Sequence, residues 1–368
     1  RYQGAVVRAR AEKYFLGEQP TKRAMEEEKR YAMSKEIPEI EQNSVLIQDK
    51  AIIANVFCEH YKELFGNNET SKDYEYLKEL VSLLPQLDQQ STKELEEPFS
   101  IDEIEKAVDA LPNKKTPGPD GITAEFYKLR KNILCPILLA IFQEAYATNS
   151  LPPSFLRTHT ILIPKTDDKQ KLLHVTGYRP ITLCNVDYKI FAKMLTNRLQ
   201  RVICDLVGNH QTCGIRGRAI QTNVHIARSV LECVTDSSNQ IAILQIDLAK
   251  AFDRVCHSVL FTILSYVGVG NMIFEGVKMS YSNCYTSLVI NNNVTTKIPV
   301  RSSVRQGCPL SPLLFTLYLE PLCQSIKRSE QVQGYVLCKT EIKVQAYADD
   351  VAYFCKDKKS VTHAIELT

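Results

Sequence analysis

The sequence lacks the features that mark membrane, secreted and zinc-binding proteins. No apolar run approaches the roughly 20 residues of a membrane-spanning helix, and the start, RYQGAVVRARAEKYF, contains no signal-peptide core. The twelve cysteines form no C-x-x-C pair and no Cys/His cluster at zinc spacing. We therefore expect a soluble, globular, intracellular protein with reduced thiols and no disulfide-linked partner.

An initiator methionine, internal repeats and low-complexity tracts are also missing. The missing methionine leads us to expect a fragment or a processed piece of a longer protein. At 368 residues the chain is long enough for two or three domains, and 44% hydrophobic residues supply a core.

The net charge of +3 conceals an uneven distribution. Residues 51–110 carry 5 Lys and Arg against 14 Asp and Glu, whereas residues 111–368 carry 30 against 19. A basic C-terminal part suits an anionic polymer as partner, although a solvated surface of mixed charge gives the same sum.

Local patterns predict an α+β protein. Residues 1–50 are highly charged and favour helix, and the acidic stretch 66–98 favours helices joined by polar loops up to a domain edge near 98. Ser100 and Glu103 have capping-box spacing at the start of a helix over 100–112. Further helices are expected over 134–149, 185–207 and 309–328.

Strands are expected mainly after residue 240. IAILQID (241–247) favours a strand, and TSLVINNNVTTKIPV (286–300) favours a hairpin that turns at its Asn residues. GYVLC (334–338) and KVQAYADDVAYFC (343–355) are expected to make a second hairpin. Unequal spacing of strands and helices predicts helices on one face of a mainly antiparallel sheet.

Two adjacent carboxylates, Asp349 and Asp350, interrupt the apolar run at 343–355, although Asp is rarely buried unless it is paired or holds a metal. Asp247 closes the strand at 241–247, where a turn or cap residue is the ordinary interpretation. If the two strands are neighbours, three carboxylates converge and require a cation. Oxygen ligands suit Mg²⁺, and two such ions indicate nucleotidyl transfer.

The chain resembles the reverse transcriptase of LINE-type non-LTR retrotransposons in six ordered blocks. These are LIPK (162–165), YRPITLCNVDYKIFAKMLTNRL (178–199), HQTCGIRGRAIQTN (210–223), QIDLAKAFDRV (245–255), VRQGCPLSPLLFTLYLEPL (304–322) and YADD (347–350). The resemblance implies an RNA-directed DNA polymerase that copies retrotransposon RNA into cDNA by two-metal nucleotidyl transfer. It also implies an intracellular ribonucleoprotein in nucleus and cytoplasm, not a secreted protein.

The implied fold is the right-hand polymerase fold, with fingers, an antiparallel palm sheet backed by helices, and a mainly helical N-terminal extension. The corresponding segments are the extension (1–98), a helical pre-fingers segment (99–160), fingers (161–235) and palm (236–368). The chain ends eighteen residues after Asp350. We therefore expect a palm truncated after the YADD hairpin, no thumb and no endonuclease, and poor primer extension by this chain alone.

The resemblance also implies roles for single residues. Asp247, Asp349 and Asp350 correspond to the catalytic triad that binds two Mg²⁺ ions, with Mn²⁺ as a substitute. Phe252 corresponds to the aromatic wall against the sugar 2′ position, where a core Phe is the alternative. The next residue, Asp253, is expected to cap the following helix rather than to bind metal.

Nucleotide contacts are implied for Gln306, which can bond the sugar, and for Gly307, which lets the backbone approach closely. The family usually has Gly where this chain has Ser303, so we expect a changed turn there. Lys165 and Arg179 correspond to cations that meet the triphosphate.

Nucleic-acid contacts are implied for Lys114 and Lys115, on template phosphates, and for Arg218, on template backbone or a fingers loop. Asp120 is expected in a turn. The implied partners are an RNA template, a DNA primer or target DNA, and dNTPs, without a membrane.

The sequence leaves two alternative functions open. One is a catalytically inactive or domesticated nucleic-acid-binding remnant of the same fold; the intact carboxylates and cations disfavour it. The other is a two-metal polymerase that makes RNA, which Phe252 disfavours because its ring leaves no room for a 2′-hydroxyl.

Overall fold

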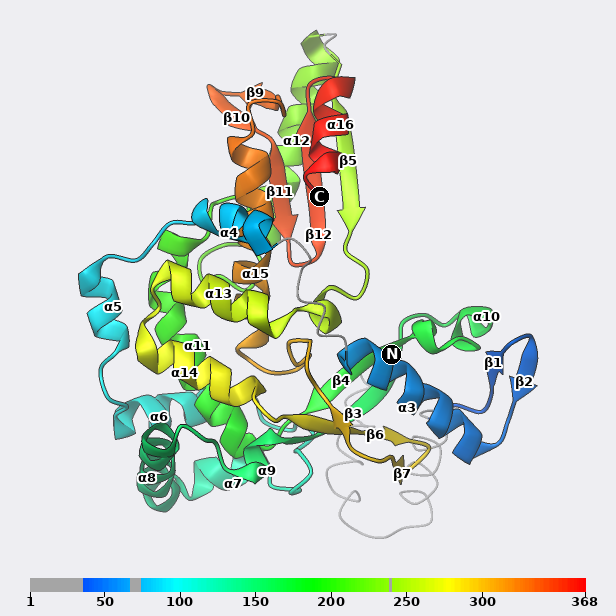
Figure 1. The fold of residues 1–368 in the computed structure, drawn as a ribbon, viewed down its shortest axis with the longest axis vertical. Coiled ribbons are helices and arrows are strands. Elements are labelled where there is room, and N and C mark those ends of the chain that lie inside the picture. The colour runs from blue at the N-terminus through cyan, green and yellow to red at the C-terminus, as the bar shows by residue number, and fades with distance from the viewer. Residues whose placement is uncertain (1–35, 67–73, 238–239) are drawn as a thin grey trace, which may run out of the picture. The chain divides into compact units, whose positions relative to one another are not determined.

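The computed structural model describes residues 36–66, 74–237 and 240–368 (Figure 1). The chain divides into two compact units. The smaller unit contains the chain up to Cys58 together with Ile161–Pro180 and Leu288–Thr295; the larger contains Glu59–Thr160, Ile181–Ser287 and Thr296–Thr368. The division into an N-terminal extension, a pre-fingers segment, fingers and palm stays a prediction.

The smaller unit contains a β-hairpin where the sequence predicted helix. Strands β1 (Ile40–Gln42) and β2 (Val45–Ile47) pair antiparallel. Asn43 and Ser44 between them have φ values of 52° and 62°, a left-handed conformation that Asn tolerates well and that interrupts a helix. The prediction of helix is therefore wrong for residues 40–47; residues 1–35 lie outside the described part of the chain.

Short elements and one longer helix complete the N-terminal region and the smaller unit. They are α3 (Lys50–Gly66), α10 (Lys169–Leu172) and the 3₁₀ turn η1 (Val175–Gly177).

Five strands of unequal length form one sheet. Their order is β4 (Tyr178–Leu183), β3 (Arg157–Pro164), β6 (Tyr285–Ile290) and β7 (Asn293–Val294), and β8 (Ile298–Pro299) also pairs with β6. The hairpin predicted at the Asn run is confirmed, because β6 and β7 pair antiparallel. Asn291 and Asn292 turn it with φ values of 50° and 65°. Two positive φ values are typical of the type I′ turn that suits the twist of a hairpin.

The larger unit is mainly helical. Its helices are α4 (Tyr74–Ser82), α5 (Gln89–Leu95), α6 (Ile101–Asp109), α7 (Ala124–Leu129), α8 (Lys131–Thr148), α9 (Pro153–Leu156), α11 (Val186–Leu206), α12 (Ile220–Ser237), α13 (His257–Val267), α14 (Gly270–Tyr281), α15 (Ser311–Arg328) and α16 (Lys358–Glu366), with the 3₁₀ turn η2 (Ala251–Arg254). The predicted helices at 100–112, 134–149, 185–207 and 309–328 are confirmed. So is the capping box, in which Ser100 and Glu103 each accept the other's backbone N–H through their side chains.

Helix α11 lies at the centre of the core, where it packs against α5, α6, α14 and α15. The rings of Phe99, Phe142 and Phe191 meet there with centroids 5.2–6.4 Å apart. Arg198 of α11 is 2% exposed; its Nε and Nη2 donate to Glu103 at 2.9 and 2.7 Å, and it also donates to the carbonyls of residues 95, 97 and 98. These bonds satisfy a cation that burial would otherwise make costly.

A three-stranded antiparallel sheet stands beside this core in the order β11 (Val344–Tyr347), β12 (Asp350–Cys355) and β5 (Ala242–Asp247). Val351, Tyr353 and Cys355 are buried with the main core. Helix α16 packs against β12 and β5, and α12 packs against β11 (Figure 1). The structure therefore confirms the α+β class and the antiparallel sheet.

The second predicted hairpin is in fact two hairpins. GYVLC supplies β9 (Tyr335–Leu337), which pairs with β10 (Thr340–Ile342), while KVQAYADDVAYFC forms the separate pair β11 and β12. Cys338 and Lys339 have φ values of 48° and 70°, so the chain reverses immediately after β9. This early turn gives β9 a local partner and leaves β12 free to pair with β5.

Candidate active site

Strand register brings the three predicted carboxylates to one end of a sheet. Asp247, the last residue of β5, lies directly opposite Asp350, the first residue of β12. Opposed residues of an antiparallel pair share a face, with Cβ atoms about 4.5–5.5 Å apart. Asp349 precedes Asp350 in the turn that leaves β11. The expectation that the two Asp-bearing strands are neighbours is confirmed.

These residues fit a hard divalent cation by their chemistry. Asp247 and Asp350 are exposed and Asp349 is half-buried, so solvent and a ligand can reach them. Their donors are carboxylate oxygens alone, which Mg²⁺ prefers, and like charges this close favour a cation. As they stand, no three His, Cys, Asp or Glu side chains of the described chain are arranged to hold a metal ion.

A buried acceptor orients Gln306. The amide Nε2 of Gln306 donates to Asp253 Oδ1 at 2.9 Å, and Asp253 is 5% exposed within η2. Helix α13 begins at His257, with Cys256 at the capping position. The prediction that Asp253 caps this helix is therefore wrong, because its carboxylate faces the loop that carries Gln306.

The loop at residues 302–307 is tied to its neighbours by backbone hydrogen bonds. Val304 N–H donates to Phe252 O at 2.8 Å, and Thr182 N–H donates to Gln306 O at 2.8 Å. Gly307 has a φ of 106°, and a Cβ there would lie 3.0 Å from the Thr182 carbonyl oxygen. Glycine adopts this φ without strain and leaves room for this approach.

The ring of Phe252 stacks on Phe315 of α15, with centroids 4.6 Å apart and an interplanar angle of 13°. Phe252 is half-buried. The packing interpretation and the sugar-contact interpretation are thus compatible, because one ring face is fixed by Phe315. Contact with a nucleotide sugar stays a prediction.

Ser303 has a positive φ, a conformation that glycine adopts without strain. Its φ is 99° and its side chain is buried. Its N–H donates to Val255 O and its carbonyl accepts from His257 Nε2, both at 2.8 Å. Burial lowers the pKa of His257, which keeps the imidazole neutral. A serine therefore holds a strained conformation here, and an altered turn relative to the family stays a prediction.

Sequence reasoning missed Arg305, next to Gln306. Its guanidinium is 4% exposed and lies 4.5 Å from the centroid of the Tyr188 ring and 5.4 Å from that of Tyr281. Nη2 donates to Ser280 O at 2.6 Å. A lone Arg is ordinarily a surface charge, so no local pattern indicated that this one anchors the loop through aromatic rings.

The two cations predicted to meet a triphosphate lie in the smaller unit. Lys165 directly follows β3, Arg179 lies in β4, and both are exposed. The two strands are neighbours, and Lys165 N–H donates to Gly177 O at 2.9 Å, two residues before Arg179. Triphosphate binding by this pair stays a prediction.

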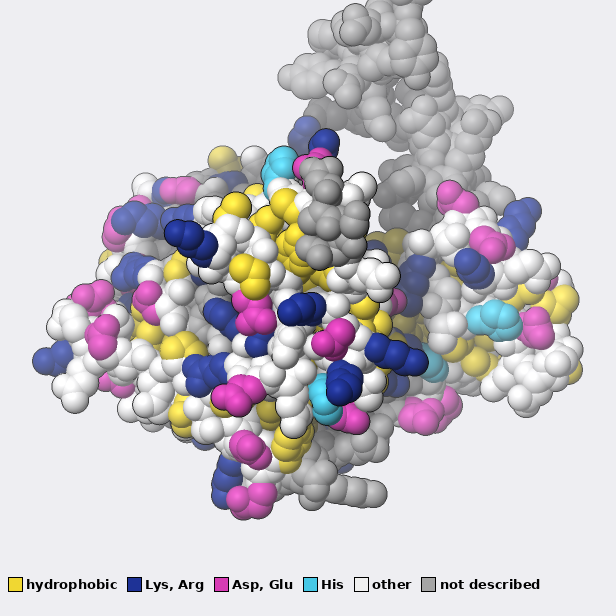
Figure 2. Space-filling model, turned by 90° about the horizontal axis from the view of Figure 1, so that it is seen from above, with side chains coloured by type: hydrophobic (Ala, Val, Ile, Leu, Met, Phe, Trp, Pro, Cys, Tyr) yellow, Lys and Arg dark blue, Asp and Glu magenta, His cyan; other side chains and the backbone are white. Residues whose placement is uncertain are grey.

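The other predicted cations lie in loops of the larger unit. Lys114 and Lys115 are exposed, and Asp120 makes the expected turn by accepting the N–H of Ile122 at 3.0 Å. Arg218 is half-buried and donates to three backbone carbonyls, so its guanidinium has a structural role; contact with a template stays a prediction. Figure 2 shows Lys and Arg side chains interspersed with Asp and Glu on the face it presents.

Comparison with known proteins gives the family. The family model described as reverse transcriptase (RNA-dependent DNA polymerase) matches residues 163–368, more than half of the chain. The chain belongs to the reverse transcriptase family. The matched segment contains all three carboxylates and the Gln306 loop.

Similar proteins come from retrotransposons, which confirms the resemblance to LINE-type non-LTR elements. The transposon TX1 uncharacterized 149 kDa protein of Xenopus laevis is 33% identical over 87% of this chain and 24% of its own length. The probable RNA-directed DNA polymerase from transposon BS of Drosophila melanogaster is 25% identical over 81% of this chain and 32% of its own length. The Pol polyprotein from the type-1 retrotransposable element R2 of Popillia japonica is 26% identical over 69% and 34%. The reverse transcriptase chain thus spans a quarter to a third of these relatives.

Two further observations concern chemistry and membranes. The twelve cysteines all lie in the described part of the chain, and none of them forms a disulfide bond. Among the helices of residues 36–66, 74–237 and 240–368, none combines the length and the apolar character needed to cross a bilayer.

Proposed function

We propose that this reverse transcriptase chain carries the nucleotidyl-transfer site of an RNA-directed DNA polymerase that copies retrotransposon RNA into cDNA. Its substrates are an RNA template, a DNA primer or target DNA, and dNTPs, in an intracellular ribonucleoprotein of nucleus and cytoplasm. The observation that carries the proposal is the register that pairs Asp247 with Asp350 beside Asp349, within the segment that matches the family. The printed name of the relative from transposon BS, an RNA-directed DNA polymerase, supports it.

Asp247, Asp349 and Asp350 would hold two Mg²⁺ ions, with Mn²⁺ as a substitute. Bound ions of this kind lower the pKa of an attacking hydroxyl and neutralise charge on a leaving pyrophosphate. The chain's own contribution is a fixed spacing of the carboxylates, because β12 is hydrogen-bonded on both edges, to β11 and to β5. Such preorganisation avoids a reorganisation cost during the reaction.

The loop at residues 302–307 supplies the proposed nucleotide site. Gly307, which packs closely on the Thr182 carbonyl, lies against the nucleotide, and Gln306, oriented by Asp253, bonds the sugar. Phe252, fixed by its stacking on Phe315, occupies the space beside the 2′ position and so selects dNTPs. These roles need rigid side chains, and each one is held by a contact within the same unit.

The proposed cations act on phosphates. Lys165 and Arg179 neutralise the triphosphate, as charge-assisted hydrogen bonds do at developing negative charge. Lys114 and Lys115 contact template phosphates, which predicts that their removal weakens binding mainly at low salt.

Asp349→Asn in the natural full-length protein tests the proposal. The amide keeps the size of the side chain but removes the charge, so cDNA synthesis should be lost while RNA binding, measured by filter retention, is preserved. Asp205→Asn, an exposed carboxylate of α11, is the matched control and should retain both. Equal loss of synthesis and binding in Asp349→Asn would show a structural role and overturn the proposal.

A further inference from the structure

The edge of β11 that does not pair with β12 is hydrogen-bonded to a segment from a distant part of the chain. We call residues 207–218 the bracing segment. Ala346 N–H donates to His210 O at 2.7 Å, and Thr212 N–H donates to Ala346 O at 3.2 Å. Gln211 and Ala346 form a parallel β-bridge. The bracing segment therefore extends the ladder of the Asp-bearing sheet on the side opposite β5.

The side chain of Gln211 reaches the turn that carries the carboxylates. Gln211 is 1% exposed, and its Oε1 accepts the N–H groups of Cys213 at 3.0 Å and of Ala348 at 3.3 Å. Ala348 is the first residue of the turn and has a φ of 54°. A residue other than Gly, Asn or Asp adopts this left-handed conformation at a cost of roughly 1–2 kcal/mol. The turn therefore needs a contact from another segment to hold it.

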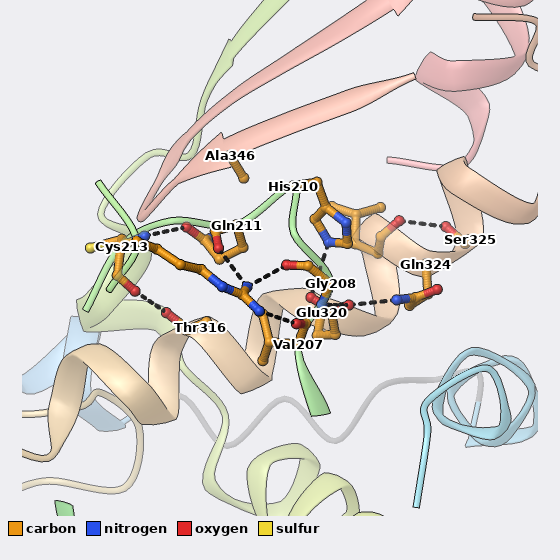
Figure 3. Close-up of polar contacts among 12 residues, drawn as sticks. Val207, Gly208, His210, Gln211, Cys213, Thr316, Glu320, Gln324, Ser325 and Ala346 are labelled. Carbon is orange, nitrogen blue, oxygen red and sulfur yellow. Dashed lines mark hydrogen bonds and ion pairs between the residues drawn. The ribbon is translucent and has the colours of Figure 1, made fainter. Parts of the chain in front are cut away.

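Buried polar contacts fix the bracing segment itself (Figure 3). Glu320 of α15 is fully buried; it accepts Gly208 N–H at 3.0 Å, His210 Nε2 at 3.1 Å and Gln324 Nε2 at 2.6 Å. A Cβ on Gly208 would lie 2.3 Å from the His210 ring, so only glycine permits this contact.

Arg218 closes the bracing segment on itself. Its guanidinium donates to the carbonyls of Val207, Gly208 and Gln211 at 2.6–2.9 Å. A buried carboxylate and a half-buried guanidinium are costly unless every partner is present, so this network has few alternative arrangements. Gln211 is therefore presented to Ala348 from a rigid base.

We propose that Gln211 is a positioning residue, which holds the turn at Ala348 so that Asp349 and Asp350 face Asp247 and bind divalent cations as a set. The inference rests on the proposed function. An observation on Gln211 itself supports it. Its Nε2 is buried with no hydrogen-bond partner among the described residues, a cost that stability alone does not explain.

Gln211→Met tests the proposal, because Met keeps the length of the side chain and removes the acceptor. The readout is Mn²⁺ affinity of the folded full-length protein, measured by electron paramagnetic resonance without nucleic acid or turnover. Loss of a residue that orients metal ligands lowers metal affinity by about 10-fold or more. Thr212→Val is the control, because the Thr212 hydroxyl is buried without a hydrogen-bond partner in residues 36–66, 74–237 and 240–368; it should leave Mn²⁺ affinity unchanged.

Gln211→Met in an Ala348→Gly background supplies a second test, which separates a role through Ala348 from a general loss of structure. Glycine adopts positive φ without strain, so the turn then needs less support. In the Ala348→Gly background, Gln211→Met should lower Mn²⁺ affinity by less than about 3-fold. The full 10-fold loss in both backgrounds would contradict a role through Ala348.

The outcomes separate this proposal from the proposed function. A Mn²⁺ site that Asp349→Asn abolishes and Gln211→Met leaves unchanged overturns the positioning role alone. The absence of any Mn²⁺ site sensitive to Asp349→Asn overturns the proposed metal chemistry and the positioning role together. Weaker binding in Gln211→Met, with Thr212→Val unchanged and thermal stabilities matched, supports both.

Discussion

Replacing Ser303 by Gly should stabilise the protein, although Ser303 is buried and makes several hydrogen bonds. Its φ of 99° lies in a region where a residue with a Cβ is strained by on the order of 1–3 kcal/mol. The backbone cannot relax, because its N–H and its carbonyl are both held at 2.8 Å by Val255 and His257. Glycine removes the strain and keeps both of these bonds.

Two terms oppose this gain. The greater freedom of glycine in the unfolded chain costs about 0.4–1 kcal/mol. Loss of the hydrogen bond from Ser303 Oγ to Val304 O, which is 3.3 Å long, costs about 0.5–1 kcal/mol. With a strain near the middle of its range, the free energy of unfolding should rise by about 0.5 kcal/mol.

Equilibrium urea unfolding, followed by circular dichroism, tests this with two controls. Ser303→Ala keeps the strain and loses the hydroxyl, so it should be less stable than the parent by about 0.5–1 kcal/mol. Ser302→Gly changes a neighbour whose φ is not positive and whose Oγ donates to Leu64 O at 3.1 Å, so it should also destabilise. A Ser303→Gly protein no more stable than Ser303→Ala would refute the argument from strain.

Three other substitutions test the core, a buried carboxylate and the nucleotide site. Arg198→Met should lower the free energy of unfolding by about 3–5 kcal/mol in urea titrations, because it removes the buried hydrogen bonds to Glu103 and to three carbonyls. The control Arg201→Met, 55% exposed and 3.8 Å from Glu103, should cost less than about 1 kcal/mol; equal effects would contradict the argument. Burial raises the pKa of Asp187 from 3.8 to about 6, so the stability it contributes is complete below pH 3.8 and is lost as pH rises through about 6. Asp187→Asn should remove that pH dependence of thermal stability and be more stable than the parent at pH 7, whereas an unchanged profile would assign it to another group. Phe252→Ala in the full-length protein should raise the ratio of NTP to dNTP incorporation, measured as kcat/KM; an unchanged ratio would leave the ring a packing role alone.

Local sequence patterns predicted the elements whose cause is local. The capping box at Ser100 and Glu103 formed because both partners lie within one turn of helix. The hairpin at Asn291 and Asn292 formed because those residues tolerate positive φ. In both cases the physical cause is complete within a few residues, so no knowledge of tertiary contacts was needed.

Two predictions, the helix over residues 40–47 and the helix cap at Asp253, were wrong although the sequence contained a relevant local signal. The charged stretch before α3 favoured helix by composition, but Asn43 and Ser44 reverse the chain between β1 and β2. Asp253 had the position of a helix cap by sequence, but η2 turns its carboxylate toward Gln306, 53 residues away. Tertiary contact decided the role of Asp253, and composition was too weak a guide to the hairpin.

The sequence allowed a prediction of the carboxylates of the candidate site, but not of the residues that hold its segments in place. Asp350 interrupts the apolar run at 343–355 and Asp247 ends another, a departure from local pattern that marks functional residues. Gln211 and Arg305 show no such departure, because a Gln in a loop and a single Arg are common on surfaces. Their importance appears only when the fold buries them, one beside Ala348 and the other between Tyr188 and Tyr281.

Buried polar groups are therefore found next to the segments that carry the site residues. Asp253 orients Gln306, Arg305 anchors the same loop, and Glu320 fixes the bracing segment that contacts the Asp-bearing turn. Each would be replaced by an apolar side chain if stability alone were selected, because desolvating a charge costs more than packing a hydrocarbon. A network of buried hydrogen bonds does what an apolar core cannot, since hydrogen bonds fix direction as well as distance. The support of this site is thus predicted to be more sensitive to isosteric polar-to-apolar changes in activity than in stability.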